Sequence, residues 1–171
     1  MNLLDFFKEQ YYYELDRKHQ HLRLLNISLI IVGAIMGTVW LYLSSFEFSQ
    51  GILTCSFVFA LAIAIIGVLG AISFIIISHF DYEYRYLPGG SELLEWYNQL
   101  VGYYDKYPGA NALEHFEKEL ISRFSYAAHI NMMNNEKKSK SIHNANKFII
   151  ISIVGILICS IPYFINYFLH K

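Results

Sequence analysis

The stretch LLNISLIIVGAIMGTVWLYLSSF, residues 24–46, decides the fold class of this chain. Its 23 residues include no Asp, Glu, Lys or Arg. A helix needs roughly 20 apolar residues to cross the hydrocarbon core of a bilayer. A core helix of a soluble protein would keep a polar face, and this stretch has none of useful width. We therefore predict a transmembrane helix at residues 24–46.

Two further stretches have the same character and predict two more spans, at residues 52–78 and 148–169. The composition agrees, because 55% of the residues are apolar and only 16% are charged, whereas a soluble domain is about one quarter charged. The first stretch is too long for a cleavable signal peptide, and 23 polar or mixed residues precede it. We predict an all-α integral membrane protein with three transmembrane helices.

The Lys and Arg residues fall almost entirely on one side of the predicted spans. Four precede the first span, eight lie between the second and third, and the link around residues 45–51 has none. The only basic residue after the third span is Lys171. Cytoplasmic loops are enriched in Lys and Arg. We therefore expect a multi-pass protein of the cytoplasmic (inner) membrane, with its N-terminus in the cytoplasm and its C-terminus outside.

The region between the second and third spans, residues 79–147, is predicted to be cytoplasmic and to hold a helical hairpin. Ser91 can cap the first helix. The helix then presents apolar side chains on one face, and these are Leu93, Tyr97, Leu100 and Tyr104. Pro108 and Gly109 are expected to break the chain.

The second helix of this hairpin is expected to begin at Asn111, which with Glu114 resembles a capping box. Its apolar stripe consists of Leu113, Phe116, Leu120 and Phe124. No Pro or Gly occurs from residue 110 to residue 154, so one helix over residues 112–169 could run directly into the third span. Residues 131–146 are rich in Asn, Ser and Lys, which form helices less readily than Ala, and a break there is the alternative.

Residues 1–23 are predicted to form a cytoplasmic amphipathic helix. An apolar cluster at its start has no membrane span to belong to, and its members are Leu3, Leu4, Phe6 and Phe7. Three placements are open for this cluster. It packs on the hairpin, it lies at the bilayer surface, or it binds a partner protein.

Small residues recur at four-residue spacing in the first two spans, which lets helix backbones approach closely in lipid. They are Gly33 and Gly37 in the first span, and Ala60, Ala64, Gly67 and Ala71 in the second. Contacts among the spans of one chain and contacts between chains both fit this pattern. Pro162 is a candidate kink in the third span.

No residue pattern indicates catalysis, a metal site or a cofactor. The spans contain no Asp, Glu, Lys or Arg, which argues against an ion-coupled transporter. No zinc-binding motif, phosphate-binding loop or nucleophile elbow occurs. The two cysteines, Cys55 and Cys159, lie at different predicted depths and are not expected to pair. A formal net charge of -1 gives no reason to expect nucleic acid. We predict a protein that is not an enzyme.

The layout of the chain resembles the SLATT-type membrane effectors of bacterial conflict systems. The residues that carry this resemblance are the basic segment 11–23 before the first span and the aromatic, charged segment 80–86 after the second. Residues 126–147, leading into a third span, also resemble small membrane proteins of antiphage defence loci. A third span departs from the simplest SLATT plan. The resemblance implies an oligomeric effector that perturbs the membrane, by a pore or by disruption, and it implies no catalytic residue.

Two functional hypotheses follow. The first is a homo-oligomeric effector of a bacterial defence system of the abortive-infection type, triggered through its cytoplasmic helices. The second is a non-catalytic membrane scaffold or sensor subunit that anchors and regulates a cytoplasmic partner protein encoded nearby. In both hypotheses the lipid bilayer is a partner.

Overall fold

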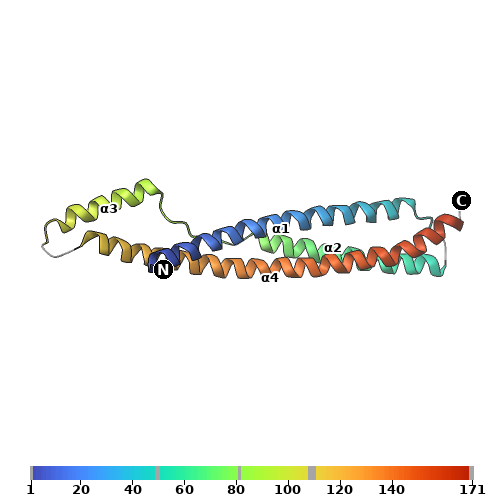
Figure 1. The fold of residues 1–171 in the computed structure, drawn as a ribbon. Coiled ribbons are helices and arrows are strands. Elements are labelled where there is room, and N and C mark those ends of the chain that lie inside the picture. The colour runs from blue at the N-terminus through green and yellow to red at the C-terminus, as the bar shows by residue number, and fades with distance from the viewer. Residues whose placement is uncertain (1, 49–50, 81, 108–110, 170–171) are drawn as a thin grey trace. The chain divides into compact units, whose positions relative to one another are not determined.

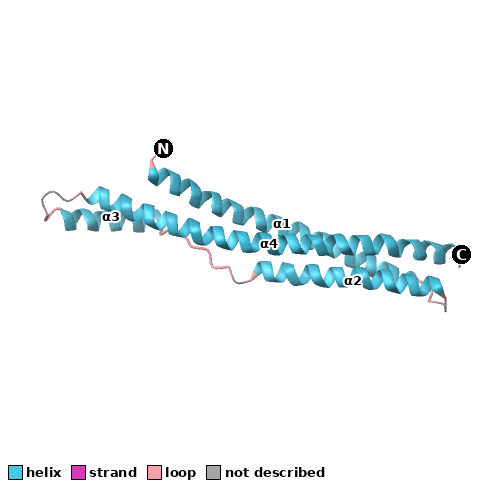
Figure 2. Ribbon diagram, turned by 90° about the horizontal axis from the view of Figure 1, so that it is seen from below, coloured by secondary structure: helices cyan, strands magenta, loops and turns pink. Residues whose placement is uncertain are grey.

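The computed structural model describes residues 2–48, 51–80, 82–107 and 111–169, and these residues form four α-helices (Figure 1). The helices are α1 (Leu3–Ser45), α2 (Ile52–His79), α3 (Gly90–Tyr104) and α4 (Ala112–Leu169). The described residues contain helices and connecting loops but no strand (Figure 2). The predicted all-α class is therefore confirmed. Three of these helices, α1, α2 and α4, are long and apolar enough to cross a membrane.

The two longest helices continue through boundaries that the sequence left open. α1 passes from the predicted N-terminal helix into the first apolar stretch without interruption. α4 has 58 residues and contains the whole stretch at 131–146 where a break was the alternative. The absence of Pro and Gly from that stretch removes the two residues that most strongly interrupt a helix. α4 also continues through Pro162 to Leu169.

The chain divides into two compact units. The first unit comprises residues 1–20 and 82–136, and the second comprises residues 21–81 and 137–171. α1 and α4 contribute residues to both units, α2 belongs to the second, and α3 belongs to the first.

The core of the second unit is apolar and draws on all three of its helices. One cluster contains Leu25, Val32 and Ile35 of α1, Val68, Ala71 and Ile75 of α2, and Ile142, Ala145 and Ile149 of α4. A second cluster surrounds Phe57, which is fully buried and whose ring stacks on that of Phe46 at 3.8 Å between centroids. Cys55 and Cys159 are both free, as the sequence predicted, with Cys55 exposed and Cys159 buried.

The core of the first unit joins the start of α1 to the first half of α4. Tyr11 packs its ring edge-on against Phe124, and both side chains are at least nine-tenths buried. Leu4 and Phe7 pack against this cluster. The N-terminal apolar residues therefore divide between two environments, because Leu3 and Phe6 stay 57% and 38% exposed.

The first turn of α4 is capped by a side chain, whereas that of α3 is not. The expected cap at Ser91 is wrong, because α3 begins at Gly90 after the N-cap residue Gly89, and no side-chain hydrogen bond caps it. The cap at Asn111 is confirmed, since its Oδ1 accepts from the backbone N–H groups of Leu113 at 3.0 Å and Glu114 at 3.4 Å. The Glu114 carboxylate instead pairs with Lys118 at 2.8 Å. The predicted break at Pro108 and Gly109 lies outside the described residues.

Candidate functional site

The small residues predicted for helix packing separate into two groups in the second unit. Those of α2 are buried, with Ala60 at 1% exposure and Ala64 and Ala71 at 0%. A Cβ atom added at Gly67 would lie 2.8 Å from the backbone N of Ser152 on α4. A Cβ atom added at Gly155 of α4 would lie 2.7 Å from the backbone N of Ala64. The small residues of α2 therefore permit a close approach to α4 within one chain.

A serine hydrogen bond reinforces this close approach. Ser152 Oγ lies 3.1 Å from the carbonyl oxygen of Ala64 on α2 and 3.1 Å from that of Phe148 on its own helix. Ser152 is fully buried. Hydrogen bonds between helices and backbone contact at small residues are the interactions that associate helices in lipid.

Gly33 and Gly37 of α1 behave differently. A Cβ atom added at either position would meet nothing within 4 Å. Both glycines are exposed, and so are their neighbours Ile30 and Trp40, each at 73%. Within the described residues, the glycine pair of the first span therefore makes no packing contact inside the chain, and its face of α1 is open.

The two apolar stripes predicted for the hairpin lie in the first unit and meet at Phe116. The ring of Phe116 lies 4.8 Å from Trp96 and 5.2 Å from Tyr97 between centroids. Leu120 and Phe124 are each 9% exposed. The remaining members, Leu93, Leu100, Leu113 and Tyr104, are partly or largely exposed, and Tyr104 stacks on His115.

The contact between these stripes is incomplete. α3 has no buried residue. A groove of about 540 Å³ remains, lined by Gly90, Leu93, Leu94, Tyr97, Leu113, Phe116 and Leu120. Leu94 and Leu113 are 61% and 50% exposed. This groove is an apolar surface that the described part of the chain does not cover.

Sequence reasoning missed the polar interactions that organise the first unit. Residues 82–89, which we call the strap, form neither helix nor strand. Their peptide groups need hydrogen-bond partners, and two asparagines of α4, Asn131 and Asn134, bond some of them. Asn131 Oδ1 accepts from Arg85 N at 2.9 Å, and Asn131 Nδ2 donates to Arg85 O at 3.0 Å. Asn134 Nδ2 donates to Glu83 O at 2.8 Å.

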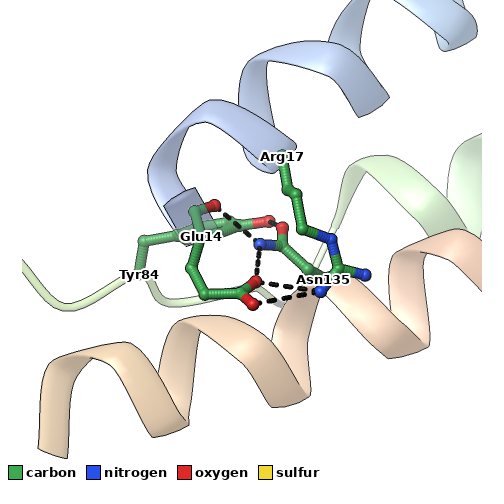
Figure 3. Close-up of polar contacts among 4 residues, drawn as sticks. All are labelled: Glu14, Arg17, Tyr84 and Asn135. Carbon is green, nitrogen blue, oxygen red and sulfur yellow. Dashed lines mark hydrogen bonds and ion pairs between the residues drawn. The ribbon is translucent and has the colours of Figure 1, made fainter. Parts of the chain in front are cut away.

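Asn135 connects the strap to α1 (Figure 3). Its Oδ1 accepts from the Tyr84 hydroxyl at 2.7 Å. Its Nδ2 donates to both the backbone oxygen and the carboxylate of Glu14, at 2.7 and 2.8 Å. Arg17 lies 3.1 Å from each carboxylate oxygen of Glu14. Asn135 is fully buried and Glu14 is 4% exposed, so the carboxylate is removed from water but fully partnered.

Two further residues of α1 hold the strap. Leu87 N donates to the Tyr11 hydroxyl at 3.2 Å. Lys18 Nζ donates to the Tyr86 hydroxyl and lies 4.7 Å from the centroid of the Tyr84 ring. A cation over an aromatic face is attracted by the ring quadrupole. Burial raises the pKa of Tyr84 to about 12, with further contributions from Tyr82, Tyr86 and Glu14.

The sequence carried a signal for this site. Asn131, Asn134 and Asn135 have the i, i+3, i+4 spacing of one helix face, and an Asn-rich face inside a helix requires partners. The alternating tyrosines at 82, 84 and 86 point to an extended segment. Neither signal identifies which segment meets which helix. Among the described residues, no three His, Cys, Asp or Glu side chains group as a metal site.

No family model, no curated protein and no solved structure matches this chain.

Proposed function

We propose that this chain is a homo-oligomeric membrane effector of a bacterial defence system of the abortive-infection type. In this proposal it perturbs the inner membrane, by a pore or by disruption, when its cytoplasmic helices are triggered. The observation that carries self-association is the open glycine pair of α1, since a Cβ atom added at Gly33 or Gly37 would meet nothing within 4 Å. The defence role is supported by the resemblance to SLATT-type effectors.

The physical argument compares the glycines of the three long helices. The space beside Gly67 is filled by α4, and the space beside Gly155 is filled by α2 of the same chain. Lipid tails are as apolar as Leu side chains, so apolar contact alone does not drive helices together in a bilayer. Helices associate there through faces of small residues, where their backbones can approach closely. A second copy offers the same face in a self-complementary arrangement. Gly33 and Gly37 therefore support an interface between copies.

Control by the first unit is supported by the continuity of α1 and α4. Both helices contribute to the first unit and to the apolar second unit. In the proposed topology the first unit is cytoplasmic, its α3 and the start of α4 form a hairpin, and the N-terminus is on the same side. In this proposal, a change in the first unit reaches the second through α1 and α4, which contribute residues to both units.

A second candidate function is a scaffold or sensor subunit that holds a cytoplasmic partner protein. The groove at Leu93, Tyr97 and Phe116 supports it, because an uncovered apolar surface of this kind is common at protein interfaces. This function needs no change in membrane permeability. The two candidates therefore differ in what happens to the membrane potential.

The test is induced expression in bacterial cells with a potential-sensitive dye. The effector proposal expects depolarisation and growth arrest with the wild-type chain under triggering or high expression. Gly33→Ile combined with Gly37→Ile should abolish both effects, whereas Ala62→Ile, at an exposed position of α2, should keep them. Unchanged potential and growth with the wild-type chain, together with a partner lost on Leu94→Asp, would favour the scaffold.

A further inference from the structure

Side chains of α1 and α4 hold the strap by hydrogen bonds. It has no regular secondary structure, and its bonds to α4 come from Asn131, Asn134 and Asn135. Its bonds to α1 come from Tyr11 and Lys18. The strap therefore lies against two helices at once within the first unit, and neither helix holds it alone.

Asn135 connects the strap to a further contact, the one between α4 and α1. One side-chain amide accepts from Tyr84 of the strap and donates twice to Glu14 of α1. If Tyr84 leaves, Asn135 Oδ1 loses its partner at a site with no solvent exposure. If α1 leaves, the Asn135 amide N–H groups lose their acceptors, whereas the Glu14 carboxylate keeps Arg17 of its own helix. Each partial loss leaves buried polar atoms unsatisfied, which costs more than a net hydrogen bond contributes.

Buried polar networks of this type are stable when complete and unfavourable when half complete. Asn131 and Asn135 are both fully buried, and Glu14 is nearly so. Removal of the strap takes the partners from Asn131 and from the Oδ1 of Asn135, while Glu14 of α1 still holds the Nδ2 of Asn135. The intermediate in which the strap is half released is therefore the least favourable state.

We propose that the strap is a two-state latch, in which the bonds of residues 82–89 to α1 and to α4 are made and lost in a single step. Release of the latch takes Tyr84 from Asn135, which also bonds Glu14 of α1, while the apolar contact of Tyr11 with Phe124 still joins α1 to α4. The strap is also the segment that follows α2 along the chain and precedes α3. That the latch regulates the membrane effect rests on the proposed function, whereas the two-state behaviour does not.

The test is reciprocal amide exchange, measured by NMR on the full chain in detergent micelles with ¹⁵N-labelled Arg and Leu. Tyr11→Phe removes the acceptor of the Leu87 amide, and the amide to follow is that of Arg85. Asn131→Ala removes the acceptor of the Arg85 amide, and the amide to follow is that of Leu87. A two-state latch predicts that each variant accelerates exchange at the distant amide about tenfold. Asn98→Ala, on the exposed side of α3, should leave both rates unchanged.

Exchange that rises only at the amide whose own acceptor was removed would overturn the proposal, because the strap would then open residue by residue. Tyr84→Phe removes a single hydroxyl and serves if Asn131→Ala does not fold. The latch predicts that Tyr84→Phe accelerates amide exchange at Arg85 and at Leu87 by the same factor. Unequal acceleration at the two amides would also overturn the proposal. These measurements need no cellular activity, so failure of the effector proposal would not be mistaken for failure of the latch.

Discussion

The side-chain amide of Asn131 pairs with both peptide groups of Arg85, at 2.9 Å to its N and 3.0 Å to its O. Asn166 pairs in the same way with Glu47, at 3.2 and 3.0 Å. Both asparagines belong to α4, and both partners lie in segments that adjoin α2 along the chain. In each case an amide side chain supplies the donor and acceptor that irregular backbone lacks.

The Asn166 pairing predicts a loss of stability on truncation. Asn166→Ala leaves the Glu47 peptide groups without these bonds, and Asn166 is 4% exposed, so we expect a loss of about 1–3 kcal/mol. Thermal unfolding of the purified chain in detergent, followed by circular dichroism, measures it. Asn98→Ala at an exposed position should shift the midpoint much less. Equal shifts for the two variants would show that the Asn166 bonds contribute little.

Tyr84 predicts a pH dependence of the strap. Its pKa is raised from 10.0 to about 12, so the folded state favours the neutral phenol. Its contribution to stability is present in full below pH 10 and is lost as the pH rises through about 12. The ultraviolet titration of the wild-type chain minus that of Tyr84→Phe should show one tyrosine that ionises near pH 12. A difference titration centred near pH 10 would contradict the buried hydroxyl.

The Phe116 contact predicts that charge will dismantle the first unit. Phe116→Asp with Leu120→Asp places carboxylates among Trp96, Tyr97 and Phe124, at a cost on the order of several kcal/mol. Protease digestion should then cut within residues 90–136, while membrane insertion persists. An effector would lose regulated toxicity or become toxic without a trigger.

Leu94→Asp is the matched variant for the groove. Leu94 is 61% exposed and lines the groove, so we expect this change to alter the groove surface and to leave the fold intact. A scaffold would lose a co-purifying partner with Leu94→Asp while cell growth stayed normal. If Phe116→Asp combined with Leu120→Asp matches the wild type in growth, membrane potential and pull-down, residues 79–147 are a passive link between the spans.

The distribution of Lys and Arg predicts the orientation of the chain. A reporter that is active only in the cytoplasm should give no signal when fused after Lys171, and a strong signal when fused before residue 2. A reporter active only outside the cytoplasm should show the opposite pattern. Strong cytoplasmic signal from both fusions would contradict an odd number of spans.

Several elements of the fold could be predicted from the sequence because one local property decides each of them. The three apolar helices follow from length and the absence of charge, and the start of α4 follows from the side-chain chemistry of Asn111. Ser is a preferred N-cap residue, but α3 begins at Gly90 after Gly89, so Ser91 lies inside the first turn and not at the cap position.

The candidate sites were harder to predict because they depend on contacts between distant segments. Asn131 and Asn135 are weak helix formers by local propensity, and their bonds to Arg85 and Glu14 exist only after folding. Spacing alone gave Gly33 and Gly67 the same interpretation. The structure separates them, because a Cβ atom added at Gly67 would meet Ser152 and one added at Gly33 would meet nothing within 4 Å.

The mass of the purified chain in detergent measures self-association through Gly33 and Gly37 most directly. Sedimentation with the detergent contribution subtracted should give a multiple of 19.9 kDa for the wild-type chain and for Ala62→Ile. Gly33→Ile combined with Gly37→Ile should give a folded monomer of about the single-chain mass, because a Cβ atom added at either position meets no atom of another element within 4 Å. A wild-type chain that is already monomeric, or a double variant that keeps the wild-type mass, would contradict an interface at this face of α1.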